Sequence, residues 1–277
     1  MNDQSIAVDS ARINSTLILI PVFNNQAALD FTLASLVGTD AHDAAVLVVD
    51  DGSAVALVAR PRLKGVRIKR LDRNVGIASA LNEGLRLARA EGYAYVLRLD
   101  AGDGYIDGRL SRQFEFLNAH PDVAIVGSAA EYFYPQTGGT ITYVPPLDHQ
   151  SILRRLRYHN PIVHPSIMMR LDALEDNYST RYPASEDYEL YLRVSGKWRL
   201  ANVPECLCRY EVNSGSISAL RRKRQLMNGI RLKLKYFDWG DRGSYIGLVE
   251  NIVRYAMPSF AARLLSKLKN GQMPSRW

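Results

Sequence analysis

Six carboxylates stand as three pairs in short polar stretches: Asp50 and Asp51 in VVDDGS, Asp100 and Asp103 in LRLDAGDGY, and Glu186 and Asp187 in SEDYELY. A carboxylate at a strand end can accept from a base N–H or from ribose hydroxyls, which suits the first pair to nucleoside recognition. Loop carboxylates can hold a divalent metal beside a phosphate, which suits the second pair. A carboxylate at a helix start can take a proton from an attacking hydroxyl, which suits the third pair.

The elements that must position these acids alternate along the N-terminal part of the chain. Apolar runs predict strands and helical spacing predicts helices: strands within 15–25, 44–53, 66–74 and 93–103, and helices within 26–39 and 75–92. Fully apolar strands that alternate with helices indicate a parallel sheet covered on both faces. Ligands of such sheets bind beyond the carboxyl ends of the strands. The segments 21–25, 50–53 and 100–103 all fall at such ends.

The pattern changes beyond residue 108. A helix, a strand and a hairpin around Gly138 are predicted, followed by a short helix that begins at the third acidic pair and a basic helix over about 218–238. No linker or repeat divides the chain. We therefore interpret it as an N-terminal tail (1–14), one α/β domain (15–218) and a C-terminal helical extension (219–277).

Composition limits the kinds of partner. The 277 residues are 47% hydrophobic, which is ample for a sizeable core, and carry a net charge of +7. That charge favours anionic partners: nucleic acid, phosphorylated ligands or an anionic membrane face. Cys206 and Cys208 are two residues apart and are expected to be reduced, as in a cytosolic protein. No signal-peptide pattern or membrane-spanning apolar run is present, so a soluble or peripheral protein is expected.

Six segments, in this order, resemble the family 2 inverting glycosyltransferases, which have the GT-A nucleotide-sugar fold: LIPVFNN, VVDDGS, NVGIASALNEGLRLARAEGYAYVLRLDAGD, GRLSRQFEFLNAHPDVAIVGS, NPIVHPSIMMR and SEDYELYLRVSGKW. The resemblance covers about residues 15–225. It implies a mostly parallel central sheet flanked by helices. A nicotinamide dehydrogenase of similar architecture would need G-x-G-x-x-G after the first strand, where this chain has proline and asparagines.

The resemblance implies transfer of a sugar from a nucleotide-diphospho sugar, expected to be a UDP-sugar, to a hydroxyl of a glycan or lipid-linked acceptor. Its setting would be bacterial surface polysaccharide or lipopolysaccharide synthesis, with no nucleic acid partner. Asp187 is expected to be the catalytic base, with Glu186 as the other member of the acidic pair. The alternative is that both acids only interact with the helix dipole.

The residues expected to bind the nucleotide sugar are Pro21, Phe23, Asn24, Asp50, Asp51, Asn74, Gly76, Asp100, Ala101 and His164. Asp51 is expected to contact the base, although one acid of its pair could instead cap the following turn. Backbone donors at Asn74 and Gly76 are expected near the diphosphate, unless they only start an ordinary helix. His164 is expected near the acceptor or donor sugar, or else is a structural hydrogen bonder.

The metal-binding pattern of the family is altered at two positions. Family members usually show D-x-D-D, and Gly102 replaces the carboxylate at the third position. A second family ligand is often a histidine, and Asn213 stands in its place. With these two ligands replaced, a manganese or magnesium cofactor would have to be held by Asp100 or Asp103 and by the diphosphate of the donor.

A basic run and an apolar stripe lie in the C-terminal extension. Arg221 and Arg222 are expected to neutralise the departing diphosphate if metal is weak or absent, the alternative being a solvated or membrane-facing helix surface. The apolar stripe at helical spacing comprises Val249, Ile252, Val253, Ala256, Phe260, Leu264 and Leu268. It predicts peripheral contact with an anionic membrane, at the cytoplasmic face of the plasma membrane, or packing against the domain. The altered metal pattern also leaves an alternative of another class, an inactive family member that binds glycan or acts as a scaffold.

Overall fold

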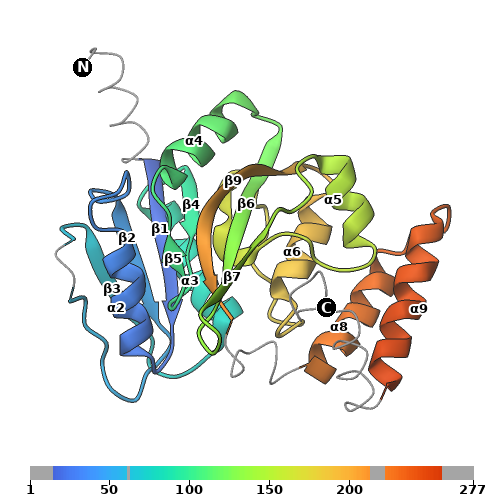
Figure 1. Cartoon of the computed structure of the whole chain (residues 1–277), viewed down its shortest axis with the longest axis horizontal. Helices are drawn as coiled ribbons and strands as arrows, with labels where there is room; N and C mark the ends of the chain where they lie inside the picture. Colours follow the sequence, from blue (N-terminus) through green and yellow to red (C-terminus); the bar gives the residue numbers. More distant parts are fainter. Residues whose placement is uncertain (1–14, 61–62, 213–221, 258–277) are drawn as a thin grey trace.

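The computed structural model describes residues 15–60, 63–212 and 222–257. Its N-terminal half is a parallel sheet with strand order β3-β2-β1-β4 (Figure 1). The strands are β1 (Thr16–Val22), β2 (Ala45–Asp50), β3 (Val66–Arg70) and β4 (Tyr95–Arg98). The helices between them are α2 (Gln26–Ser35) and α3 (Ile77–Ala90). These elements confirm the predicted alternation.

The two faces of this sheet are both covered, because consecutive side chains of a strand point to opposite sides. Ile18 and Ile20 of β1 belong to one buried cluster with Leu29 of α2. Leu19 belongs to a second cluster with Leu81 of α3. The whole of β1 is therefore buried, which explains why its sequence is apolar without alternation.

The second half of the sheet is mixed. Its strands are β5 (Gly104–Tyr105), β6 (Val123–Tyr134), β7 (Gly139–Tyr143), β8 (Met168–Arg170) and β9 (Arg199–Glu211). β8 is antiparallel to both β4 and β6, so it joins the two halves, and β6 pairs with β9 in parallel. β6 and β7 form an antiparallel pair, which confirms the predicted hairpin. The helical elements of this half are α4 (Arg109–Ala119), α5 (His149–Leu156), η1 (His164–Ser166) and α6 (Glu186–Val194).

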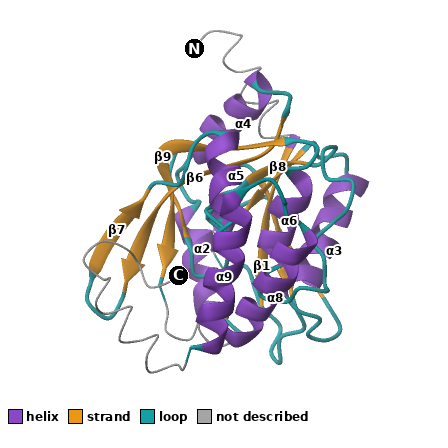
Figure 2. Cartoon of the chain, turned by 90° about the vertical axis from the view of Figure 1, so that its right-hand side faces the viewer, coloured by secondary structure: helices purple, strands orange, loops and turns teal. Residues whose placement is uncertain are grey.

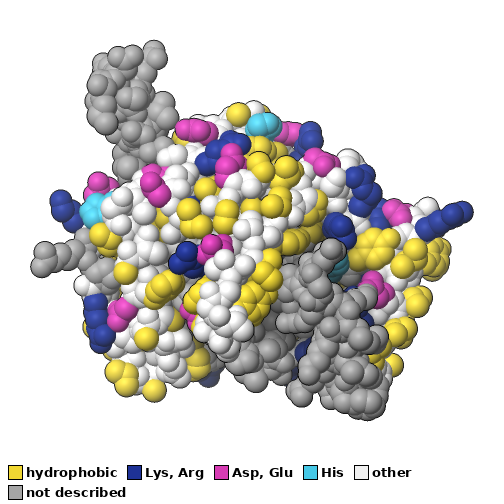
Figure 3. Space-filling model, in the orientation of Figure 1, with side chains coloured by type: hydrophobic (Ala, Val, Ile, Leu, Met, Phe, Trp, Pro, Cys, Tyr) yellow, Lys and Arg dark blue, Asp and Glu magenta, His cyan; other side chains and the backbone are white. Residues whose placement is uncertain are grey.

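A helical hairpin of α8 (Arg222–Lys235) and α9 (Arg242–Ala256) lies beside α6 at one side of the sheet (Figure 2). The Asn228 side chain of α8 donates to the backbone oxygen of Pro183, 2.9 Å away. The hairpin thus packs on the domain, while hydrophobic side chains lie on the surface at the side of α9 (Figure 3). The predicted helix start at Ser218, together with residues 258–277, lies outside the described part.

Candidate active site

The loops after β1 and β2 are joined by two hydrogen bonds at the carboxyl edge of the sheet. The backbone N–H of Asn24 donates to Ser53 Oγ (2.8 Å), and the Asn24 Oδ1 accepts from the backbone N–H of Ala54 (2.8 Å). Asn24 has φ of +51°, a conformation that asparagine tolerates better than most residues. Phe23 beside it is exposed, whereas Pro21 is buried within β1. Of the residues predicted here, Phe23 offers a surface to a ligand and Pro21 only supports the sheet.

Asp50 and Asp51 have different surroundings. The Asp50 side chain is fully buried, its Oδ1 accepts from the backbone N–H of Ser53 (2.9 Å), and its Oδ2 lies 3.7 Å from Arg70 Nε. Asp50 therefore fixes the turn after β2. Its expected role toward the donor stays a prediction.

Asp51 is held by the start of α3. Its two carboxylate oxygens accept from the backbone N–H groups of Val75 (2.8 Å) and Gly76 (2.9 Å). The N–H of Gly76 is thus directed at Asp51, while Asn74 is exposed, and their expected role toward the diphosphate stays a prediction. Gly52 makes this approach possible, because a Cβ there would lie 2.3 Å from the carbonyl carbon of Arg73. The role of Asp51 toward the base stays a prediction.

The loop that carries Asp100 is fastened to α2. Thr32 Oγ1 donates to the backbone oxygen of Asp103 (2.8 Å) and accepts from the backbone N–H of Gly102 (2.9 Å). Gly102 has φ of +101°, a conformation that side-chain-bearing residues rarely adopt. Asp100 is partly exposed, next to Ala101, and one of its oxygens lies 2.8 Å from Arg98 Nη2. The glycine thus sets the shape of this loop as well as removing a carboxylate.

Asp103 is directed into the protein, toward the end of β9. Its side chain is buried, and its Oδ1 accepts from the backbone N–H of Glu211 at the end of β9 (3.1 Å). Over the described ranges, no group of three or more His, Cys, Asp or Glu is arranged to hold a metal ion. Asp100, already paired with Arg98, is one partly exposed carboxylate. These donors do not fit a metal held by protein side chains alone; Asn213 lies outside the described residues.

Asp187 presents an oriented and accessible carboxylate at the start of α6. Its side chain is 25% exposed, and its Oδ2 accepts from Asn160 Nδ2 (2.8 Å) and lies 3.9 Å from His164 Nδ1. Its Oδ1 accepts from the backbone N–H of Tyr188 (2.7 Å). A carboxylate held in this way can accept a proton from a hydroxyl group that approaches from solvent.

Glu186 is buried, and its Oε2 is one of the described side-chain atoms that have no hydrogen-bond partner. Burial, together with the nearby charge of Asp187, raises the pKa of Glu186 to about 7. The two acids of this pair therefore differ in exposure and in their surroundings.

His164, a predicted site residue, contacts two tyrosines that were not predicted. His164 Nε2 lies 2.9 Å from the hydroxyl of Tyr178, and the His164 ring packs edge to face on Tyr191. These contacts make His164 a structural hydrogen bonder that also lies beside Asp187. Asn160, which donates to Asp187, was not predicted either. It stands four residues before His164 in the NPIVHPS segment, and that segment is the part of the sequence that could have indicated it. Tyr178 belongs to no recognisable motif.

The basic run is only partly described. Arg222 is the exposed first residue of α8, and Arg221 lies outside the described residues. Among the described residues, no hydrogen bond or ion pair joins Arg222 to Asp100, and the role of Arg222 toward a diphosphate stays a prediction.

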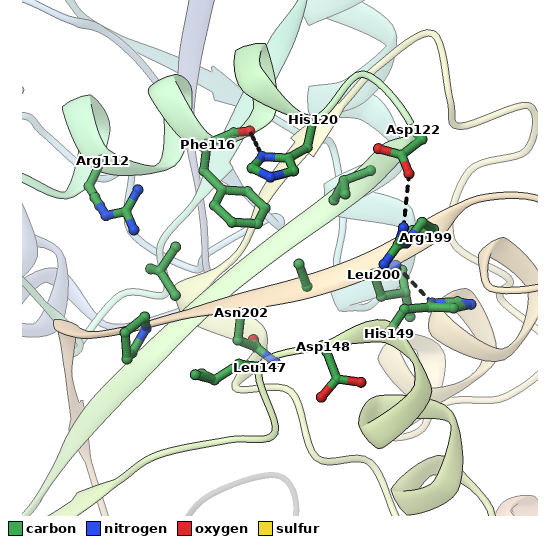
Figure 4. A pocket seen from close by; sticks show the side chains of 14 residues that line it. Arg112, Phe116, His120, Asp122, Leu147, Asp148, His149, Arg199, Leu200 and Asn202 are labelled. Atoms are coloured by element: carbon green, nitrogen blue, oxygen red, sulfur yellow. Dashed lines mark hydrogen bonds and ion pairs between the residues drawn. The ribbon is translucent and has the colours of Figure 1, made fainter.

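A cavity of about 330 Å³ lies elsewhere, at the starts of β6 and β9 (Figure 4). Phe116 and His120 of the α4 end stack on each other at one wall, and Arg199 and Asp122 form an ion pair at another. Because β6 runs in the same direction as β4, strand starts in both halves lie at the edge opposite to the carboxyl ends. This cavity contains none of the predicted site residues.

The chain is similar in sequence to known glycosyltransferases. The profile of the family described as Glycosyl transferase family 2 matches residues 17–178. An uncharacterized glycosyltransferase of Haemophilus influenzae is 27% identical over 267 residues, with 92% of this chain and 96% of the relative covered. The amylovoran biosynthesis glycosyltransferase AmsE of Erwinia amylovora is 27% identical over 250 residues, with 86% and 92% covered.

Two solved structures show the same fold. The mannosyltransferase PcManGT of Pyrobaculum calidifontis, in complex with GDP-Man and Mn2+, has a TM-score of 0.62 at 18% identity, covering 94% of this chain and 76% of its own. S. aureus TarS 1-349, in complex with UDP-GlcNAc, has a TM-score of 0.63 at 14% identity, with the same coverage. The predicted GT-A fold is thereby confirmed.

Proposed function

Because the chain belongs to glycosyl transferase family 2, we propose that it is an inverting enzyme that moves a sugar from a nucleotide-diphospho sugar to an acceptor hydroxyl. The observation that carries this proposal is the Asp187 carboxylate, partly exposed at the start of α6 and oriented by Asn160. A general base must be held in one orientation and must be reachable by the proton it takes. Asp187 meets both conditions.

In the proposed reaction, the acceptor oxygen attacks the anomeric carbon on the side opposite to the diphosphate. The bond between that carbon and the diphosphate oxygen breaks, and its electron pair leaves with the nucleoside diphosphate. The hydroxyl proton passes to the carboxylate of Asp187. The hydrogen bond from Asn160 keeps this carboxylate from turning, and the His164 ring lies beside it.

We propose a UDP-sugar as donor and a glycan or lipid-linked molecule as acceptor, in bacterial surface polysaccharide or lipopolysaccharide synthesis. Support for the nucleotide comes from TarS, whose structure holds UDP-GlcNAc, while PcManGT holds GDP-Man. Support for the acceptor class comes from AmsE, which is named for amylovoran biosynthesis. Manganese or magnesium enters this proposal only as an ion bound together with the diphosphate of the donor.

We also propose that the enzyme works at the inner face of the plasma membrane, where a lipid-linked acceptor would be presented. The net charge of +7 supports contact with anionic lipid. Across the described ranges, every helix is too short or too polar to cross a bilayer.

The test is to incubate the pure protein with a panel of nucleotide sugars and to measure release of nucleoside diphosphate, with and without glycan acceptors. We expect slow hydrolysis of a UDP-sugar. Asp187→Asn should lower turnover by about 10²–10⁴-fold with little change in nucleotide affinity. Asp172→Asn, which changes an exposed acid after β8, is the matched control and should keep full turnover. Glycan binding without turnover of any nucleotide sugar would instead favour the inactive, glycan-binding alternative.

A further inference from the structure

The side-chain pattern of α9 is inverted relative to an ordinary surface helix. The residues that face the protein are small or polar: Gly243, Ser244, Gly247 and Asn251. The residues that face solvent are large and apolar, 45–58% exposed: Tyr245, Ile246, Val249, Ile252 and Val253. We call these five residues the outward face of α9. A helix normally buries its apolar stripe, so this face is built to be covered by something else.

Close packing on the opposite side prevents α9 from turning its outward face inward. A Cβ at Gly247 would lie 2.0 Å from the backbone oxygen of Arg157. Lys233 Nζ donates to the backbone oxygen of Gly247 (3.0 Å), and Asn251 Nδ2 donates to that of Leu226 (3.0 Å). Rotation of the helix would break these contacts and push side chains into backbone. The exposed apolar face is therefore fixed by the fold.

An aromatic cluster continues the outward face at the turn of the hairpin. Trp239 is 79% exposed, and Phe237 packs edge to face with it and with Tyr245, at 4.9 Å in each case. The Tyr245 hydroxyl donates to the backbone oxygen of Trp239. Tryptophan and tyrosine that combine an apolar ring with a polar group are favoured at the boundary between lipid and water.

The charge of the hairpin selects among possible occupants of this face. Residues 222–257 contain eight Lys and Arg against three Asp and Glu, and residues 258–277 add four basic residues and no acid. A second copy of the chain would bring the same positive charge against itself, which is unfavourable. Residues 258–277 are also positively charged, so the same repulsion disfavours them as the cover of this face. An anionic lipid surface matches both the apolar face and the positive charge.

We propose that the outward face of α9, together with Trp239, docks on an anionic lipid surface, with α9 lying in the plane of the interface. The proposal deepens the proposed function, on which it rests for its biological purpose. α8 packs against α9 through the hydrogen bond of Asn251 with Leu226, and Lys235 Nζ at its end lies 3.6 Å from Glu189 Oε1 of α6. Docking would thus place the helix that begins at the catalytic acids close to the lipid, where a lipid-linked acceptor resides.

The test is flotation of the full chain with phosphatidylcholine vesicles, with and without phosphatidylglycerol. We expect binding only to the anionic vesicles, weakened by salt. Ile246→Ser/Val249→Ser should weaken that binding on the order of tenfold or more, because two apolar side chains no longer enter the interface. Ile141→Ser/Val144→Ser is the matched control, since it changes two similarly exposed apolar residues near β7, and it should bind as the wild type does. Donor hydrolysis without lipid should be equal in all three, which separates this test from that of the function.

Trp239 emission supplies a second readout that does not depend on the serine variants. Anionic vesicles should shift the emission of the wild type to shorter wavelength, and Trp239→Phe should lose most of the shift. Equal loss of flotation in both double variants, or none in either, would overturn the proposal. So would a dimer in solution that Ile246→Ser/Val249→Ser dissociates while vesicles of neither kind are bound. Stronger vesicle binding after removal of residues 258–277 would show that this segment covers the face, and would overturn it too.

Discussion

Arg98 Nη2 lies 2.8 Å from Oδ1 of Asp100, beneath the carboxyl edge of the sheet. The Arg98 side chain is only 1% exposed, and its Nε and Nη1 have no hydrogen-bond acceptor in the described structure. Burial by itself would lower the pKa of Arg98, but Asp100 and the nearby Tyr178, Tyr191 and Glu186 raise it above its ordinary value. Arg98 is therefore a permanent buried cation whose charge the acidic loop balances.

This pairing predicts that Asp100 stabilises the fold as well as the site. Asp100→Asn should lower the free energy of unfolding by about 3 kcal/mol, because it leaves the buried Arg98 without its ionic partner. Asp122→Asn is the control, because Asp122 pairs with Arg199 and both side chains are more than half exposed; its cost should stay below about 1 kcal/mol. Urea denaturation measures both. Equal losses would show that Arg98 does not depend on Asp100.

The raised pKa of Glu186 predicts a pH-dependent stability. Between its ordinary value of 4.5 and about 7, the folded protein keeps the Glu186 proton while the unfolded chain releases it. Because the folded state binds more protons there, this contribution to stability falls as pH rises through that window. Glu186→Gln removes the dependence, so its stability relative to wild type should increase by about 3 kcal/mol from pH 4 to pH 8. Unfolding curves of the wild type and of Glu186→Gln at the two pH values measure this change in relative stability. A constant difference would place Glu186 in a more polar environment than its burial indicates.

The hydrogen bond from Asn160 to Asp187 predicts a positioning role. Asn160→Ala should lower kcat about tenfold or more with little change in the KM for donor, because the base is no longer held in one orientation. Asn202→Ala removes a comparable hydrogen bond, to the backbone oxygen of Pro146, at the opposite edge of the sheet. It should cost stability while leaving kcat unchanged. A fall in kcat of the same size in both variants would mean that Asn160 acts only through stability.

The donor set around Asp100 predicts that manganese binds weakly unless a diphosphate is present. Calorimetric titration of manganese into the protein should show tighter binding with UDP than without it. Uridine should give no such gain, because it lacks the diphosphate oxygens. Tight binding without nucleotide would reveal protein ligands outside the described residues, with Asn213 the first to be tested by replacement with alanine.

Sequence patterns predicted the parts of the fold that depend on local order along the chain. The apolar run of β1 and the hairpin around Gly138 follow from side-chain period and turn chemistry, which neighbouring residues determine. Adjacent residues of an extended segment point in opposite directions, so Asp50 and Asp51 must have different surroundings. The apolar pattern of β2 does not alternate, however, and therefore does not indicate which of the two is buried. The direction of Asp103 depends on Glu211, 108 positions further along the chain.

The C-terminal hairpin shows a related limit. The spacing of Val249, Ile252 and Val253 predicted an apolar stripe, and the structure contains it. Which side of the helix is buried depends on the fit of Gly247 against Arg157, a contact between distant segments that periodicity does not encode. The stripe therefore suggested either membrane contact or packing, and the choice required the three-dimensional arrangement.

The hydrogen bonds from Val75 and Gly76 to Asp51 also have a kinetic meaning. If the N–H of the nucleobase displaces both amides from this carboxylate, capture of the donor becomes a two-step event, with a fast encounter followed by a slower rearrangement of the loop before α3. The observed rate of association would then level off as donor concentration rises. That plateau would be the opening rate of the loop, the same for every sugar that the nucleotide carries.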